Sequence, residues 1–242
     1  MDKIGDKKMV EKFHDELEEL KDEVVEMGNL SRKMLKESVI SLKELDDKKA
    51  KWVNDHKTKI ADMDNNIEKK AFRLIALYQP MAKDMRQLAC ILKLITYLTR
   101  IGRYGKDIAK IVKHFENDEH VRKLVDIPHM SDIVCSMVDD ALKAFKNGDL
   151  TIFNDFIDRE EDVDELRYSI FREALSYMME DPKVIKRCTD YIMVSRYLER
   201  CADHACKMAE KIFYMETGER VEIDCREETS KACFTVVNNN GK

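Results

Sequence analysis

Two carboxylates four residues apart, Glu199 and Asp203, are the side chains of this sequence best suited to chemistry. They lie in the segment YLERCAD, residues 197–203. On a helix this spacing places both acids on one face, where they could bind a cation. They could also form a solvated face, because arginines at 196 and 200 would offset a repulsion of roughly 0.2–0.5 kcal/mol. The pair alone leaves both interpretations open.

A second acidic pair, Glu160 and Asp164, favours the cation site. We expect the two helices that carry the pairs to be antiparallel neighbours joined by a turn near residues 180–181. Asp164 lies about as many residues before that turn as Glu199 lies after it. The two acidic pairs should therefore lie at nearly the same height along their helices. Carboxylate oxygens alone suit magnesium, calcium, manganese or iron better than zinc. His204 should point about 100° away from Asp203 and serve at most as an outer residue.

The chain also repeats itself at an offset of one hundred residues. YLTR at 97–100 matches YLER at 197–200, and Asn-Asp at 54–55 matches Asn-Asp at 154–155. Thr99 and Arg103 occupy the places of Glu199 and Asp203, so the first copy lacks the acids. The sequence therefore predicts two related helical units, of which only the second has a cation site.

Composition and periodicity predict an all-α fold. Charged residues make up 38% of the chain, with only 7 glycines and 3 prolines, which favours helices over sheets. Apolar residues recur every three or four positions from Ile91 to Val112 and from Cys188 to Ile212. We expect six long helices forming two pseudo-symmetric antiparallel three-helix bundles packed side by side. The expected helices span residues 7–45, 46–78, 80–116, 129–146, 149–179 and 182–216.

The expected organisation is a first repeat at 1–116, a linker at 117–128, a second repeat at 129–218 and a mobile tail at 219–242. Within the tail, the apolar run 233–237 could form a short strand or dock on a partner. Three aromatic and five methionine side chains of the first repeat are predicted to lie in the core. They are Trp52, Phe72, Tyr78, Met27, Met34, Met63, Met81 and Met85.

Several functional classes are disfavoured. A net charge of −5 argues against nucleic-acid binding, which needs clustered positive charge. No apolar run approaches the ~20 residues of a membrane span, and the charged N-terminus lacks the apolar segment of a secretory signal. We therefore expect a cytoplasmic protein. Seven cysteines without C-x-x-C spacing predict reduced, structural thiols, with Cys90, Cys135 and Cys188 buried.

Four motifs, including the Glu199 and Asp203 segment, connect the chain to a known family. They are Met27-Gly28, QPMAKDMR at 79–86, YMMED at 177–181 and LER followed by Asp203 at 198–203. Over nearly its full length the chain resembles the PhoU family of phosphate-uptake regulators. The resemblance implies two three-helix bundles and a non-enzymatic adaptor in phosphate homeostasis. It implies as partners components of the phosphate ABC transporter and, in bacteria, a sensor histidine kinase.

The resemblance also implies a metal cofactor, since some family members bind multinuclear iron or other metal clusters at acid-x-x-x-Asp motifs. Carried over, the ligands are Glu160, Asp164, Glu199 and Asp203, with a divalent or trivalent ion and iron favoured. The first-repeat positions read Lys57, Ala61, Thr99 and Arg103. Our hypothesis is that Lys57 and Arg103 fill that space and pair with Asp62, Asp64 or Asp107.

Two alternative functions stay open. One is a metal-free helical scaffold whose acids are solvated. The other is a carboxylate-bridged metal enzyme, which is disfavoured because such sites take a Glu-x-x-His motif from each of two helices, and this sequence has no such pair of motifs. The common nucleotide-binding and hydrolase motifs are missing as well. Formation of a homodimer is left open, and membrane association is expected only through partners.

Overall fold

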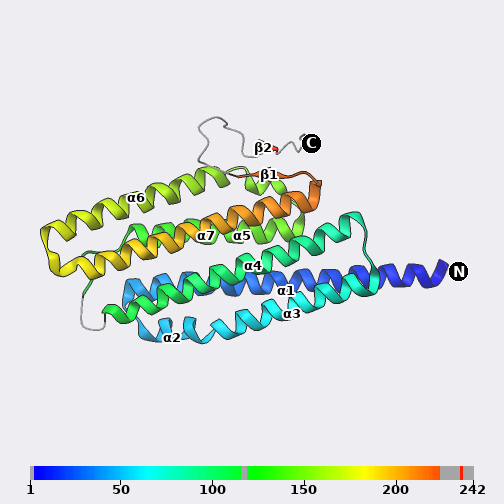
Figure 1. Ribbon diagram of the computed structural model, residues 1–242, viewed down its shortest axis with the longest axis horizontal. Helices are drawn as coiled ribbons and strands as arrows, with labels where there is room; N and C mark the ends of the chain where they lie inside the picture. The colour runs from blue at the N-terminus through cyan, green and yellow to red at the C-terminus, as the bar shows by residue number, and fades with distance from the viewer. Residues whose placement is uncertain (1–2, 116–118, 224–234, 237–242) are drawn as a thin grey trace, which may run out of the picture.

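The computed structural model describes residues 3–115, 119–223 and 235–236 (Figure 1). The long helices are α1 (Lys3–Glu44), α3 (Lys57–Tyr78), α4 (Ala82–Ile111), α5 (Asp126–Asn147), α6 (Phe156–Glu180) and α7 (Ile185–Thr217). A shorter helix, α2 (Asp47–Asp55), precedes α3, and 3-10 turns span Val112–Phe115, Leu150–Phe153 and Pro182–Val184. The two short strands are β1 (Val221–Glu222) and β2 (Thr235–Val236).

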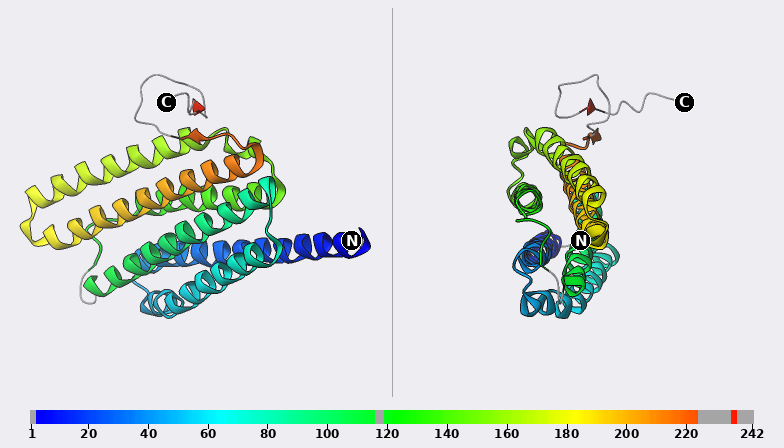
Figure 2. Two further views of the ribbon diagram at one scale, coloured as in Figure 1. Left: turned by 45° about the vertical axis from the view of Figure 1, so that its right-hand side comes forward. Right: turned by 90° about the vertical axis from the view of Figure 1, so that its left-hand side faces the viewer.

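The helices form two three-helix bundles side by side, as predicted. Helices α1, α3 and α4 pack together, with α2 against α1 and α4, and α5, α6 and α7 form the second bundle. The end-on view in Figure 2 places the second bundle above the first. Across the interface between the bundles, α1 contacts α5 and α4 contacts α7, whereas α3 and α6 lie on the outer sides. Each repeat thus buries its open face against the other, as amphipathic helices require.

Four stacked rings mark the relation between the repeats. Tyr97 and Tyr104 of α4 stack on His204 at centroid distances of 5.6 and 6.0 Å, and Tyr104 stacks on Tyr197 at 5.5 Å. Positions 97 and 197, and 104 and 204, are equivalent in the repeat. The pairing of 97 with 204 and 104 with 197 shows that α4 and α7 cross antiparallel about a pseudo-twofold axis.

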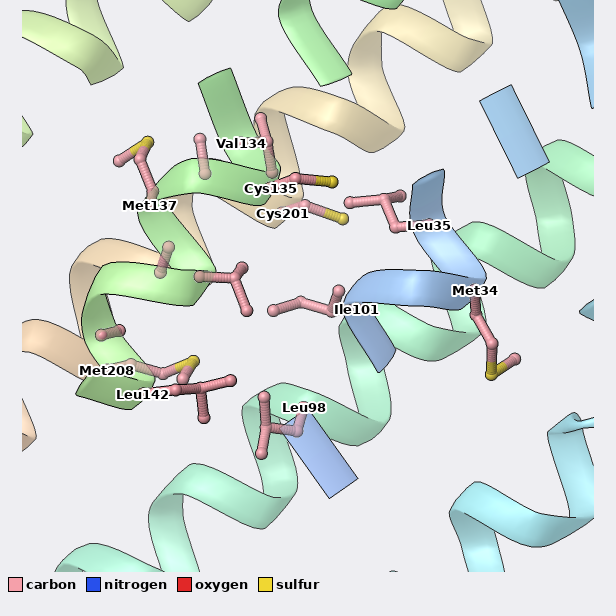
Figure 3. Close-up of a cluster of buried hydrophobic side chains, with 14 of the residues drawn as sticks. Met34, Leu35, Leu98, Ile101, Val134, Cys135, Met137, Leu142, Cys201 and Met208 are labelled. Carbon is pink, nitrogen blue, oxygen red and sulfur yellow. The ribbon is translucent and has the colours of Figure 1, made fainter. Parts of the chain in front are cut away.

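One hydrophobic core runs through both bundles (Figure 3). At its centre Leu98 and Ile101 of α4 face Leu142 of α5 and Cys201 of α7, and all four are buried. The predicted apolar stripes are confirmed, because every position of each is buried. These are Ile91, Leu94, Leu98, Ile101, Gly105, Ile108 and Val112 in α4 and its end, and Cys188, Tyr191, Ser195, Leu198, Ala202, Ala205, Ala209 and Ile212 in α7.

The structure corrects two helix boundaries at equivalent places. The predicted helix 46–78 is broken at His56, whose backbone N–H and ring Nδ1 both lie within hydrogen-bonding distance of the Trp52 carbonyl. In the second repeat α6 begins at Phe156 rather than near 149, after a 3-10 turn capped by Asp149. The repeated Asn-Asp pair at 54–55 and 154–155 therefore marks a break between helical segments in both halves.

Three side chains predicted as core are exposed, namely Phe72, Met81 and Met85. Phe72 lies on the outer face of α3, and Met81 precedes the first residue of α4. Within the apolar run 233–237, which could form a short strand or dock on a partner, residues Thr235–Val236 form β2 and pair antiparallel with β1. The rest of the predicted mobile tail, 224–234 and 237–242, lies outside the described residues. No helix in the described part of the chain is both long and apolar enough to cross a membrane.

Five described cysteines are reduced and buried, as predicted for three of them. They are Cys90, Cys135, Cys188, Cys201 and Cys206. Burial is the main cause that raises the pKa of Cys135 to about 11, so roughly one thiol in ten thousand is ionised at neutral pH. We expect a short treatment with iodoacetamide at pH 7 to leave these five unmodified, and peptide mass spectrometry to find them modified only after denaturation. Rapid labelling of Cys135 in the native protein would contradict this expectation.

Candidate functional site

The two acidic pairs lie on α6 and α7, and the turn between these helices makes them neighbours. Asp181 caps this turn, because its side chain accepts a hydrogen bond from the Lys183 backbone N–H at 2.9 Å. Helices α6 and α7 then pack along their lengths. The charge of Asp164 acts on the carboxyl group of Glu199 across this contact. The turn thus places Asp164 and Glu199 at similar heights.

Glu199 is the most buried of the four acids, at 5% exposure. Glu199 is therefore a buried residue of α7 and not one at the edge of the core. It accepts a hydrogen bond from Arg196, while its Oε2 atom is buried and accepts none from the described residues. Burial is the largest cause raising the pKa of Glu199; the charges of Asp203 and Asp164 also raise it, and Arg196 and Arg200 lower it. Its carboxylate is therefore only partly compensated.

The other acids are half-buried. Asp203 accepts a hydrogen bond from Arg200 Nη1 at 3.0 Å, and Asp164 Oδ1 lies 3.6 Å from Arg167 Nε. Glu160 is half-buried one turn before Asp164. Among the described residues, no three His, Cys, Asp or Glu side chains converge as a preformed metal site.

The donor chemistry of this carboxylate cluster, defined as Glu160, Asp164, Glu199 and Asp203, fits a hard cation. The donors are all oxygens, as magnesium, calcium, manganese and iron prefer. The buried Oε2 of Glu199 provides an acceptor without a hydrogen-bond donor among the described residues. Arginines at 167, 196 and 200 now neutralise part of the charge. A bound ion would require the carboxylates to turn away from these arginines and toward one another.

His204 lies inside the interface between the repeats, not at the surface. It stacks on two tyrosines of α4, and its Nε2 atom is buried. Burial is the main cause that lowers the pKa of His204 to about 4, with Arg100 acting in the same direction. The ring is therefore neutral at pH 7 and packs as an aromatic side chain rather than pairing with Asp203 as a cation.

The equivalent place in the first repeat is filled differently. Thr99 is buried. Burial raises the pKa of the half-buried Asp64, and a hydrogen bond from Thr99 and the charge of Arg103 lower it by a smaller amount. Ile60 faces Gly102, one turn further along. The matching positions on α3 are thus Ile60 and Asp64, in the same offset of one hundred as the rest of the repeat.

This register replaces the predicted match to Lys57 and Ala61. One acid of the first repeat, Asp64, is therefore retained. The hypothesis about Arg103 holds only in part, because its charge acts on Asp64 but the two form no ion pair among the described residues. Lys57 is exposed, and Asp107 lies beside Lys106 and Lys110 instead.

A second group of polar residues was not predicted from the sequence. Four cations line a cleft between α4, α7 and the segment leading into β1: Lys93, Lys207, Lys211 and Arg220. Lys93 stands in an apolar run of α4, whereas the other three lie more than a hundred residues later, in α7 and the segment directly after it. No local motif therefore reveals the group. Only the antiparallel crossing of α4 and α7 brings them together.

Comparison with known proteins gives concordant results. The family model described as "PhoU domain" matches residues 24–112 and 127–212. A "Phosphate-specific transport system accessory protein PhoU homolog" from Clostridium acetobutylicum is 33% identical over 213 residues, covering 88% of this chain and 97% of that protein. A protein of the same description from Caulobacter vibrioides is 35% identical, covering 88% of this chain and 93% of that protein.

Solved structures show the same fold. The crystal structure of PhoU from Pseudomonas aeruginosa superposes with a TM-score of 0.81 at 33% identity, covering 85% of this chain and 99% of that one. The phosphate transport system regulatory protein PhoU from Streptococcus pneumoniae gives a TM-score of 0.79 at 27% identity, covering 87% of this chain and 99% of that one. The similarity therefore extends over both repeats.

Proposed function

Because this chain belongs to the PhoU family, whose members matched here are named accessory or regulatory proteins of phosphate transport, we propose that it is a non-enzymatic adaptor in phosphate homeostasis. In this proposal it acts in the cytoplasm, binds components of the phosphate ABC transporter and, in a bacterium, a sensor histidine kinase. It regulates by binding its partners with different affinities in their different states. It reaches the membrane only through those partners.

The observation that carries the adaptor proposal is an exposed apolar row on α6. Tyr168, Phe171, Leu175 and Met179 follow one another at steps of three and four residues, and each is at least 41% exposed. Such spacing places them on one helical face. A contiguous exposed apolar face is typical of a protein-interaction site, and an apolar helical row of this kind docks into a groove of a partner. The row lies on the outer helix of its bundle, which the repeat interface leaves uncovered.

We expect the double substitution Leu175→Asp and Met179→Asp to weaken binding to the purified phosphate ABC transporter of the same organism at least tenfold. Two charges would then have to be buried in the interface, at a cost well above the 1.4 kcal/mol that corresponds to tenfold. Binding would be measured by surface plasmon resonance on the transporter in detergent. The matched control is Phe72→Asp and Leu77→Asp on α3, two exposed apolar residues of the first repeat.

An equal loss of affinity in both double variants would show that the α6 row is not the specific contact. Unchanged affinity in the α6 variant would show that the row does not contact the transporter. Light scattering of the free protein tests the alternative that the row joins two copies of this chain. A dimer dissociated by the α6 substitutions alone would assign the row to self-association and contradict the proposed contact.

We also propose that the carboxylate cluster holds a divalent or trivalent cation, with iron favoured by the family resemblance. The residues that would hold it are Glu160, Asp164, Glu199 and Asp203. Support comes from the oxygen-only donor set and from the buried, partly compensated carboxylate of Glu199. A bound cation would stabilise the packing of α6 against α7 by mass action. The metal-free scaffold remains the alternative function.

A further inference from the structure

We propose that the cleft between α4, α7 and β1 binds a small phosphate-bearing molecule. This interface cleft is lined on α4 by Ala89, Cys90, Lys93 and Tyr97, on α7 by Lys207, Glu210, Lys211 and Tyr214, and on the following segment by Arg220, Val221 and Glu222. Its volume is about 670 Å³, within the range of small-molecule sites. It is separate from the carboxylate cluster, and the proposal does not depend on that cluster or on the adaptor role.

The charge of the cleft is opposite to that of the whole protein. Four cations and two acids line it, which leaves an excess of two positive charges in a chain with a net charge of −5. A concave site that gathers one sign of charge raises the local concentration of the opposite ion. The clustered cations therefore favour an anionic ligand of more than one charge.

The two acids that line the cleft, Glu210 and Glu222, differ in burial and in their contacts. Glu210 is buried; its Oε1 atom accepts hydrogen bonds from Lys207 Nζ at 2.8 Å and from the Ile223 backbone N–H at 3.1 Å. Lys211 Nζ lies 3.8 Å from its other oxygen. Glu210 thus fixes two lysines and the segment after α7 in place. The exposed Glu222 lies 4.0 Å from Lys207.

Lys93 and Arg220 are the cations left for a ligand. Neither lies within ion-pair distance of a carboxylate among the described residues. Arg220 lies over the Tyr214 ring, 5.5 Å from its centroid, and Lys93 projects from the opposite helix. A guanidinium and an ammonium group on opposite walls can hold a phosphate group between them. The tyrosines Tyr97 and Tyr214 add aromatic surface on the two walls, which suits an organic phosphate larger than the free ion.

The repeat itself provides an internal comparison. At the equivalent end of the α4–α7 crossing, Lys93, Lys207 and Lys211 are replaced by Met193, Asp107 and Ile111. His114, the equivalent of Tyr214, lies 3.0 Å from the carboxylate of Asp190. That end is thus occupied by a direct contact between the helices and lacks the excess positive charge. The cationic cleft is specific to one end and is not a by-product of the duplicated fold.

The proposal is tested by isothermal titration calorimetry of the full chain at low ionic strength, with ADP, inorganic phosphate and adenosine as separate probes. We expect ADP to bind with a Kd below about 1 mM, adenosine not to bind, and added salt to weaken binding. Inorganic phosphate that binds as well as ADP would identify the phosphate group alone as the ligand. Tighter binding of ADP would show that the organic part contributes. Failure of both ADP and phosphate to bind would overturn the proposal.

The double substitution Lys93→Gln and Arg220→Gln should weaken binding at least about tenfold, since it removes two charged hydrogen-bond donors. Both residues are exposed, so the variant should fold, and its melting temperature checks this. The matched control, Lys110→Gln with Lys113→Gln, removes the same charge from exposed positions at the other end of the crossing. Equal affinity in the two variants, or binding of adenosine as strong as that of ADP, would refute the cationic cleft as the site.

Discussion

Replacing Gly105 with valine is expected to destabilise the protein by about 3 kcal/mol, near the upper end of the usual cost of overpacking. A Cβ atom at this position would lie 3.0 Å from the backbone N of Leu35 and 3.0 Å from the backbone carbonyl carbon of Met34. Backbone atoms cannot rotate away as a side chain can. Helices α1 and α4 would therefore have to separate, and the core between them would lose contacts on both sides.

The measurement is the melting temperature by circular dichroism, and the expected decrease is about 6–12 °C for a chain of this size. The matched control is Gly102→Ala on the same helix, where the new Cβ would lie 3.6 Å from the Ile60 side chain. That is ordinary van der Waals contact, and alanine is the better helix former by up to about 1 kcal/mol. A Gly105→Val protein that melts within 2 °C of the wild type would show that α1 and α4 are not packed this closely.

The second large effect concerns the carboxylate cluster. We expect protein expressed in iron-supplemented medium to contain metal, and the Glu199→Ala, Asp203→Ala double variant to lose nearly all of it. These substitutions remove the buried acceptor and its neighbour on α7, leaving two ligands on α6 alone, which cannot enclose an ion with 6–8 oxygen ligands or an octahedral site. Elemental analysis of the purified proteins provides the measurement.

The matched control is Glu161→Ala with Glu165→Ala, an acidic pair of the same spacing on α6 that is exposed. It should retain the metal. Removal of the metal from the wild type by chelation should lower its melting temperature by about 5–10 °C, the effect of losing a ligand present at about a hundred times its Kd. Full metal content in the Glu199 and Asp203 variant would place the ion elsewhere. A wild type without metal, whose melting is unchanged by chelation, would favour the metal-free scaffold.

The repeat and its helices could be predicted from the sequence because they depend on local periodicity. An apolar residue every three or four positions defines which face of α4 and α7 is buried, and the offset of one hundred defines which residues are equivalent. The same local spacing places Glu199 and Asp203 on one face of α7. Helix ends were less predictable where Asn-Asp pairs interrupt a helix without proline or glycine, as at residues 54–55.

The depth of each polar side chain depended on tertiary packing. Glu199 and His204 stand on neighbouring faces of the same helix, yet one is buried beside arginines and the other is stacked between the repeats. A helical wheel gives the angle of a side chain but not the distance of the nearest neighbouring helix. The register of α3 against α4, with Asp64 near Thr99 and Arg103, follows the offset of one hundred, and the predicted match to Lys57 and Ala61 was wrong because it departed from that offset.

The amino-acid sequence by itself determined the helical class, the duplication and the four acids of the second repeat, because each of these is written in the spacing of residues along one segment. The tertiary structure alone decided how far these acids are buried and that cations at 93, 207, 211 and 220 share one cleft. Those features arise where separate segments meet, and the crossing of α4 over α7 is set by the packing of both repeats together.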